Sequence, residues 1–349
     1  NHKGRIQCQY RNRCSRGCPY GAYFSSQAST LPAAVATGNM TLRPHSIVHT
    51  IIFDDATQKA TGVRILDAET NETIEYFAKI IFCNASALGT TQILLNSTSE
   101  RFPNGLGNDS DALGRYLMDH HFRVGASGTM EGFDDKYYKC RRPGGFYIPR
   151  FRNVDEASKM ENFVRGYGYQ GGASRKNWSR SVKELQFGGE FKDALMYPGE
   201  WRVGMTAFGE CLPYEDNRVV LNKEVTDKFG QPTLTIDCEF KENEMKMRVD
   251  MKDAAVEILE KCGLKDIDTF DDIGGPGLGI HEMGTARMGR DPKTSVLNAH
   301  NQIHAVPNVF VTDGACMTSA GCQNPSLTYM ALTARAADYA VSELKNGNL

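Results

Sequence analysis

The chain has 349 residues, enough for a large hydrophobic core and about two domains. Its formal net charge is −2 with 23% charged residues, and it has no basic stripe that would indicate a nucleic-acid partner. The longest apolar runs are too short to form a transmembrane segment, and the first residues do not have the pattern of a signal peptide. Ten cysteines in a chain of this length do not indicate a disulfide scaffold.

A cysteine-rich stretch lies near the start of the chain. Cys8, Cys14 and Cys18 follow the spacing C-x5-C-x3-C, and a proline follows Cys18. Three thiolates at this spacing are candidate ligands of an iron–sulfur cluster, and the arginines between residues 11 and 16 would offset its negative charge. A loop of thiols, or one disulfide, explains the same residues. The spacing alone leaves these interpretations open.

The next part of the chain predicts one helix and a meander of strands. Residues 25–36 have a helical pattern. Alternating apolar and polar residues then predict strands at 40–53, 61–66, 72–78 and 79–84. After the last strand come small residues from Ala85 onward and then a helix. This order lets the backbone approach a ligand closely.

The composition changes after residue 121. Glycine-rich and aromatic stretches at 144–151 and 165–172 predict an antiparallel sheet in the region 122–269. A further strand is expected at 233–240, followed by a helix over 242–262. No motif in this region identifies a substrate.

The most informative stretch runs from His281 to Leu344. It opens with His-x-x-Gly-Thr-x-x-Met-Gly at His281, continues through a buried strand at 309–312, and turns at Asp313. Asn324 and Pro325 then begin a long helix, because proline suits the first helical turn. The start of a helix presents unpaired N–H groups and a partial positive charge, and Asn324 would lie beside whatever binds there.

This order of motifs resembles the C-terminal end of the glucose–methanol–choline (GMC) flavoprotein oxidoreductases. In that family the histidine is the catalytic base, and a His or Asn about forty residues later completes the pair. The resemblance therefore implies catalytic roles for His281 and Asn324. It also implies FAD as cofactor, with proton abstraction from a substrate CH–OH group and hydride transfer to flavin N5.

The resemblance extends to cofactor-binding residues. The strand around Val48 corresponds to the family segment whose backbone meets the adenine ring, and Ala85 begins a partial match to the second family signature. At the C-terminal end, the residues implied to line the cofactor are Asp313, Gly314, Ala315, Pro325 and Ser326.

Domain boundaries follow from the same resemblance. Residues 114–120 are similar to the family's Gly-x-x-Leu-x-Asp-His stretch, where the chain leaves the cofactor domain, and His120 and His121 are expected to be structural. We expect an α+β (α/β) fold, with residues 1–119 and 271–349 forming an incomplete FAD-binding domain. Residues 120–270 would form a substrate-binding domain with a mainly antiparallel sheet.

The chain has no Gly-x-Gly-x-x-Gly motif between a strand and a helix, the unit that cradles the FAD pyrophosphate. We therefore expect it to correspond to the later two-thirds of the family, and to bind FAD weakly or not at all by itself. A non-catalytic binding or scaffold fragment is the alternative. A metal enzyme using His281, Glu282, His300 and His304 is a weaker one.

The cysteine-rich stretch is similar to a segment of the sugar dehydrogenases of this family, some of which carry a three-iron cluster there. Those proteins have an additional Cys beside the first, where this chain has Gln9. The resemblance favours a sugar or related alcohol as substrate and a dehydrogenase over an oxidase. Electrons would then pass to an external acceptor or a partner subunit.

Overall fold

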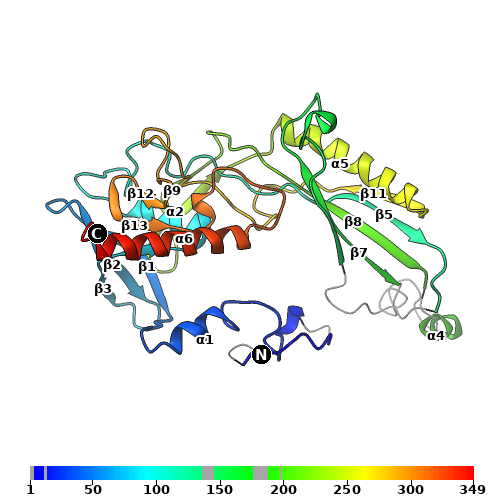
Figure 1. The fold of residues 1–349 in the computed structure, drawn as a ribbon, viewed down its shortest axis with the longest axis horizontal. Coiled ribbons are helices and arrows are strands. Elements are labelled where there is room, and N and C mark those ends of the chain that lie inside the picture. The colour runs from blue at the N-terminus through cyan, green and yellow to red at the C-terminus, as the bar shows by residue number, and fades with distance from the viewer. Residues whose placement is uncertain (1–3, 12–13, 136–144, 176–187, 197–198) are drawn as a thin grey trace.

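A computed structural model of the chain describes residues 4–11, 14–135, 145–175, 188–196 and 199–349. The molecule is elongated, with small sheets and the C-terminal helix toward one end and a long antiparallel sheet at the other (Figure 1). The expected α+β (α/β) fold class is confirmed.

A three-stranded antiparallel meander follows the N-terminal segment. Its strands, in spatial order, are β1 (Ser46–Asp54), β2 (Lys59–Asp67) and β3 (Thr73–Phe77). The first strand begins later than the predicted residue 40, because Pro44 and a left-handed His45 (φ 56°) precede it. Upstream lie η1 (Cys14–Arg16) and α1 (Thr30–Val35), the latter shorter than the predicted helix 25–36.

A parallel pair of strands brings two functional segments to one edge. β4 (Ile81–Cys83) pairs in parallel with β13 (Val306–Val311), and β12 (Gln302–Ile303) pairs antiparallel with β13. Because both carboxyl ends lie on the same side, α2 (Ser86–Asn96) and η3 (Gly314–Cys316) begin close together. Ile81, Leu94 and Val309 belong to the hydrophobic core beneath them.

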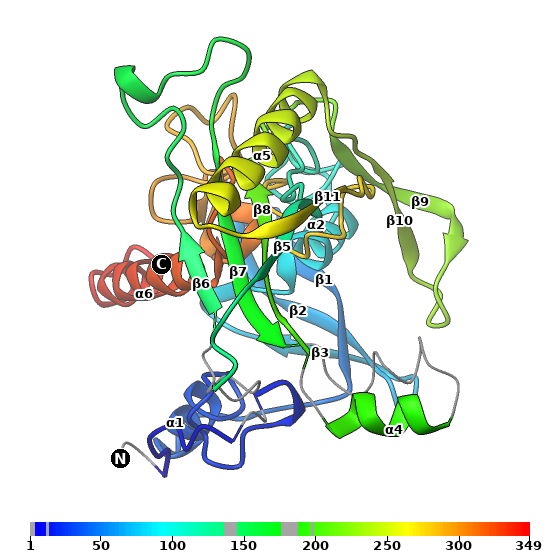
Figure 2. The same ribbon diagram turned by 90° about the vertical axis from the view of Figure 1, so that its right-hand side faces the viewer.

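The expected antiparallel sheet forms at the other end of the molecule. Its strands, in spatial order, are β11 (Lys265–Asp271), β5 (Val124–Met130), β8 (Trp201–Gly209), β7 (Tyr167–Arg175) and β6 (Gly145–Ile148). Helix α5 (Glu242–Lys261) crosses one face of it (Figure 2). Met247, Met251 and Leu259 of this helix are fully buried and pack with sheet residues in a second hydrophobic core.

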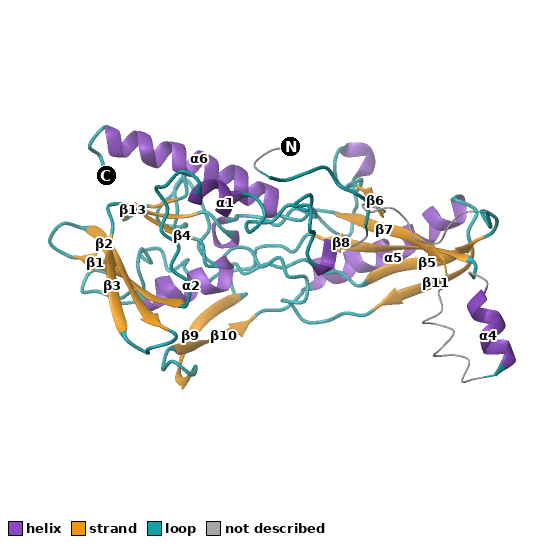
Figure 3. Ribbon diagram, turned by 90° about the horizontal axis from the view of Figure 1, so that it is seen from below, coloured by secondary structure: helices purple, strands orange, loops and turns teal. Residues whose placement is uncertain are grey.

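The predicted strand 233–240 forms, but it does not join that sheet. It is β10 (Pro232–Asp237), which pairs only with β9 (Arg218–Thr226) in the described part of the chain. This ribbon contacts α2 and lies on the opposite side of the molecule from the C-terminal helix (Figure 3). The amide of Val219 donates to the carbonyl of Gly114 (2.7 Å), which anchors the ribbon. The described chain also contains η2 (Glu156–Ser158) and α4 (Gly189–Met196).

The C-terminal helix α6 (Ser326–Lys345) forms as predicted, but its buried face differs from the one that its large apolar residues suggest. Ala336 and Ala340 are buried and pack near Phe310 of β13. By contrast, Leu327 is 77% exposed and Val341 is 50% exposed. Small residues let the helix approach the strand closely, and this leaves the bulkier side chains outside. Among the described helices, none is both long and apolar enough for a bilayer crossing.

Candidate active site

The backbone around His281 is held between two other segments. Met283 and Met118 exchange backbone hydrogen bonds of 2.8 and 2.9 Å, and the amide of Gly284 donates to the carbonyl of Gly314 (3.0 Å). Gly284 has a φ of 88°, and a Cβ there would lie 2.1 Å from the carbonyl oxygen of Tyr116. The glycine of the His-x-x-Gly-Thr motif is therefore required by both conformation and close approach.

A buried carboxylate fixes the loop that leads into His281. Asp119 is 1% exposed and accepts hydrogen bonds from the backbone amides of Gly277 (2.8 Å), Gly279 (2.9 Å) and His281 (3.1 Å). It also accepts from the amide of His120 (2.7 Å). Such bonds satisfy a buried charge and order the loop around it. Sequence reasoning missed this role of Asp119, although it belongs to a motif that was recognised.

The structure brings His281 and Asn324 together, as the sequence predicts. The amide nitrogen Nδ2 of Asn324 lies 3.2 Å from Nε2 of His281. Gln170 of β7 donates to Oδ1 of Asn324 (2.8 Å), so the antiparallel sheet reaches the pair. Burial lowers the pKa of His281, and the carboxylates of Asp119 and Glu282 act in the opposite direction. The imidazole is therefore neutral at pH 7, the form that a proton acceptor needs.

The start of α6 lies directly beside this pair. Pro325 is buried at the N-cap position, and Ser326 is exposed. Among the described residues no side chain caps the first turn, so its N–H groups are available to a ligand with partial negative charge.

The segment implied to meet the adenine ring lies beside the start of the second family signature. Val48 of β1 and Ala85 after β4 line one mainly apolar pocket of about 510 Å³, with Ile80 and Tyr76 among its other walls. A pocket of this kind suits a flat aromatic base. The next residue, Ser86, has a φ of 66°, the conformation that a glycine would adopt without strain. This residue was not singled out from the sequence.

The segment after β13 faces largely inward. Asp313 accepts a hydrogen bond from the hydroxyl of Thr90 (2.5 Å) and caps the amide of Ala315 (2.9 Å). Burial raises the pKa of Asp313. Gly314 and Ala315 are buried, and a Cβ on Gly314 would lie 2.4 Å from the carbonyl oxygen of Glu282. In this structure the segment links the end of β13 to α2, through Asp313 and Thr90.

The structure does not support the predicted iron–sulfur ligands. Within the described residues, no three His, Cys, Asp or Glu side chains gather in a way that could hold a metal ion. Cys8, Cys14 and Cys18 are therefore not assembled as a ligand set. Instead, backbone hydrogen bonds around Cys18, the largest from Tyr23, lower the pKa of its thiol. Nor do His281, Glu282, His300 and His304, all within the described residues, gather as a metal site. His300 instead stacks on Tyr339 (3.9 Å between ring centroids).

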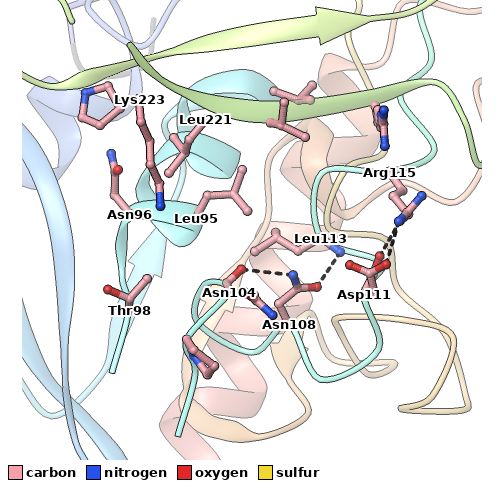
Figure 4. A pocket seen from close by; sticks show the side chains of 15 residues that line it. Leu95, Asn96, Thr98, Asn104, Asn108, Asp111, Leu113, Arg115, Leu221 and Lys223 are labelled. Carbon is pink, nitrogen blue, oxygen red and sulfur yellow. Dashed lines mark hydrogen bonds and ion pairs between the residues drawn. The ribbon is translucent and has the colours of Figure 1, made fainter. Parts of the chain in front are cut away.

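A separate pocket of about 590 Å³ lies beneath the β9–β10 ribbon (Figure 4). Leu95, Leu113 and Lys223 line it, and the loop that forms one wall is held by local bonds, such as that from the amide of Leu113 to Asn108 (3.1 Å). None of the predicted site residues lines this pocket. It is distinct from the His281–Asn324 pair.

Family comparisons agree with this geometry. Residues 3–122 and 213–333 each match a family model described as GMC oxidoreductase. A mixed fold with a histidine and an asparagine side by side at the start of a helix fits that family. The chain belongs to the GMC oxidoreductase family, and the family implies FAD as cofactor.

Two curated relatives and one solved structure illustrate the similarity. The chain is 33% identical to a 2-methyl-1,2-propanediol dehydrogenase of Mycolicibacterium austroafricanum, over 93% of this chain and 58% of that protein. It is 26% identical to the fructose dehydrogenase large subunit of Gluconobacter japonicus, over 99% and 62%. An FAD-dependent oxidoreductase from Chaetomium thermophilum shares the fold, with a TM-score of 0.55 at 14% identity over 90% of this chain and 63% of that one. The chain thus spans less than two-thirds of the length of each.

Proposed function

We propose that the full-length protein oxidises a CH–OH group of a sugar or related alcohol to a carbonyl, as an FAD-dependent dehydrogenase. The observation that carries the proposal is the placement of His281 Nε2 3.2 Å from the amide of Asn324, at the start of α6. Two relatives named for the oxidation of an aliphatic diol and of fructose support this substrate class.

The chemistry assigns a different task to each side chain. Nε2 of neutral His281 accepts the hydroxyl proton of the substrate, and the amide of Asn324 donates a hydrogen bond to the same oxygen. Gln170 keeps that amide oriented. When bound, FAD supplies the acceptor for the hydride from the substrate carbon. The N–H groups at the start of α6 stabilise negative charge that develops beside them.

The proposed cofactor site uses residues from both ends of the chain. The apolar pocket at Val48 and Ala85 suits the adenine ring, and the uncapped helix start at Pro325 and Ser326 suits an electron-rich edge of the flavin. Asp313, Gly314 and Ala315 complete the proposed cofactor-lining residues. Asp313 would act through the Thr90 contact, because its carboxylate is turned toward that residue.

The proposed domain division assigns residues 1–119 and 271–349 to FAD binding and 120–270 to substrate binding. Two separate hydrophobic cores support it, one beneath the β4–β13 pair and one between α5 and the five-stranded sheet. We propose an external acceptor for the electrons, with a partner subunit as one form of it. The relative named as a large subunit supports this. No iron–sulfur cluster is included in the proposed function.

The test is flavin reduction in the full-length protein under anaerobic conditions, with fructose and aliphatic diols as first substrates. His281→Ala is expected to slow reduction by roughly two to four orders of magnitude, the scale of a lost general base. His45→Asn is the matched control, since His45 has an exposed side chain and a left-handed conformation that asparagine tolerates. Reduction of the His281 variant at the wild-type rate would refute the assigned base. A flavin-free full-length protein would favour the scaffold alternative.

A further inference from the structure

His281 has a second partner besides Asn324. Nδ1 of His281 lies 2.9 Å from Nδ1 of His120, and Nε2 of His120 lies 2.5 Å from the carbonyl oxygen of Gly321. His120 is 1% exposed, and the two imidazole planes are inclined at 74°. The backbone amide of His120 is held by Asp119 (2.7 Å), so the ring is fixed from its base as well as from its far edge.

The carbonyl of Gly321 determines the direction of each hydrogen bond in the series that links it to His120 and His281. A carbonyl oxygen only accepts, so Nε2 of His120 must carry a proton and donate to Gly321. Burial lowers the pKa of His120 to about 4, so the ring is neutral at pH 7 and its Nδ1 is unprotonated. Nδ1 of His281 must then donate to it. Because His281 is also neutral, its Nε2 is the bare nitrogen.

The hydrogen bonds of Asn324 agree with these proton positions. A bare Nε2 on His281 requires Asn324 to present its amide N–H₂, and its Oδ1 then has to accept. Gln170 donates to that oxygen at 2.8 Å. The hydrogen bonds therefore run in one direction, from Gln170 through Asn324, His281 and His120 to the carbonyl of Gly321.

We propose that His120 is a positioning residue that selects the tautomer of His281 in which Nε2, the nitrogen facing Asn324, is the free proton acceptor. The catalytic meaning of this role rests on the proposed function, whereas the tautomer itself does not. The proton taken from the substrate hydroxyl arrives at Nε2, and the resulting imidazolium keeps its Nδ1–H bond to His120. This is the orienting task that a second group performs for a catalytic histidine.

Charged and titratable neighbours are few among the described residues near the two rings. Asp119 and Glu282 influence His281, Asp119 influences His120, and His121 lies next along the chain from His120. Burial lowers the pKa of His121 to about 3, so it stays neutral through the physiological range. Above pH 6, the hydrogen bonds of His120 and His281 therefore determine which ring nitrogens carry the protons.

The tautomer is measured by NMR of full-length protein labelled with ¹⁵N in its histidine rings, at pH 7.5 and without substrate. The His281 signals are identified by their loss in His281→Asn. A protonated Nδ1 and bare Nε2 are expected. A protonated Nε2, or a mixture of both forms in the unaltered protein, would overturn the proposal.

Two substitutions of His120 distinguish a role in orienting His281 from a role in packing alone. His120→Phe fills the site but accepts no hydrogen bond, so His281 should become a mixture of tautomers. The limiting rate of flavin reduction should then fall roughly tenfold, with little change in substrate affinity. His120→Gln offers an oxygen to His281 and N–H groups to Gly321, and should restore both the single tautomer and most of the rate.

The outcomes are distinguishable from failure of the proposed function. An unchanged tautomer in His120→Phe, or failure of His120→Gln to restore the single tautomer while the protein remains folded by circular dichroism, would overturn the positioning role. If His281→Ala reduces its flavin at the wild-type rate, the assigned base fails, and if the full-length protein holds no flavin, the proposed function fails. In both cases the NMR result still decides the tautomer.

Discussion

The imidazole of His281 serves as a base only in its neutral form, and its environment sets when that form is present. Burial lowers its pKa below the usual 6.5, although Asp119 and Glu282 partly oppose this. The active form is therefore lost only when the pH falls through this lowered pKa. Burial of His281 therefore affects the proposed proton transfer more directly than it affects the stability of the fold.

The pH dependence of flavin reduction follows from this shift. In the full-length protein, the limiting reduction rate is expected to rise with pH through a pKa below 6.5 and to be level from there to pH 8. Stopped-flow reduction between pH 4.5 and 8 measures it. A rate that still rises steeply above pH 7 would show that another group limits proton transfer.

A second residue-scale prediction concerns Gly284. In Gly284→Ala the new Cβ would lie 2.1 Å from the carbonyl oxygen of Tyr116, and φ is 88°, so both sterics and conformation oppose it. The matched control is Gly230→Ala, which has a similar φ of 77° but open space around the new Cβ. The control should cost about 1 kcal/mol of unfolding free energy, and Gly284→Ala more than twice as much. Equal melting temperatures for the two variants would contradict this account of the motif.

A motif that joins chemistry to spacing selected residues that the structure places together. His281 and Asn324 lie side by side, and Val48 and Ala85 line one pocket, while their roles stay predictions. Asp119 and His120 were recognised as motif residues, but their contacts depend on a loop at 277–281 that is distant in sequence. No local pattern reports such a contact. The cysteines illustrate the opposite error, because spacing suggested ligands that the described residues do not assemble.

Sequence periodicity predicted whether a segment forms a helix or a strand better than it predicted what that segment pairs with or packs against. The strand 233–240 and the helix from Pro325 both exist, but the strand joins β9 rather than the large sheet. The helix buries Ala336 and Ala340 rather than its large apolar residues. An alternating or helical pattern marks which side chains prefer burial, and the tertiary fold decides which of them are covered.

Helix α5 provides an element-scale prediction. Arg248 is 1% exposed, forms an ion pair with Asp271 of β11, and donates to the carbonyl of Phe122 (2.8 Å). Arg248→Met keeps most of the apolar stem but leaves that carboxylate and carbonyl without their donor. It should destabilise the protein by about 3 kcal/mol or more.

The control for Arg248 lies on the outer face of the same helix. Lys246 forms an i,i+4 pair with Glu242 at 2.7 Å, and both side chains are exposed. Lys246→Met should change stability by less than about 0.5 kcal/mol. Urea unfolding followed by circular dichroism compares the two variants. Similar midpoints for both would show that the buried pair does not fix α5 to the sheet.

The described chain combines two large cores with a proposed cofactor site that draws on widely separated segments. Val48, Ala85 and the start of α6 are far apart in sequence, and the meander and the β4–β13 pair hold them in place. Each core buries its own apolar residues. Large side chains of α6, such as Leu327 and Met330, nevertheless remain exposed. Such a surface favours association.

The final prediction concerns FAD binding by the 349-residue chain alone. The described residues offer the apolar pocket at Val48 and Ala85 and the helix start at Pro325. The sequence has no Gly-x-Gly-x-x-Gly unit between a strand and a helix, the arrangement that in dinucleotide sites supplies the phosphate cradle and much of the binding energy. Its Gly-x-Gly-x-x-Gly pattern at residues 166–171 runs into strand β7 instead. We therefore expect weak or undetectable FAD binding and no dehydrogenase activity, while circular dichroism still reports a folded chain.

Titration of FAD into the isolated chain, followed by flavin fluorescence and calorimetry, measures this directly, and the full-length protein is the positive control. The variant Val48→Asp should make no difference to the isolated chain if that chain binds no FAD, and should weaken FAD binding in the full-length protein, because a charge would enter the apolar pocket. A sub-micromolar dissociation constant, or a yellow protein directly from purification, would contradict the prediction. The pocket and helix start would then be sufficient for binding, and the glycine-rich unit would contribute far less than the physical argument assigns to it.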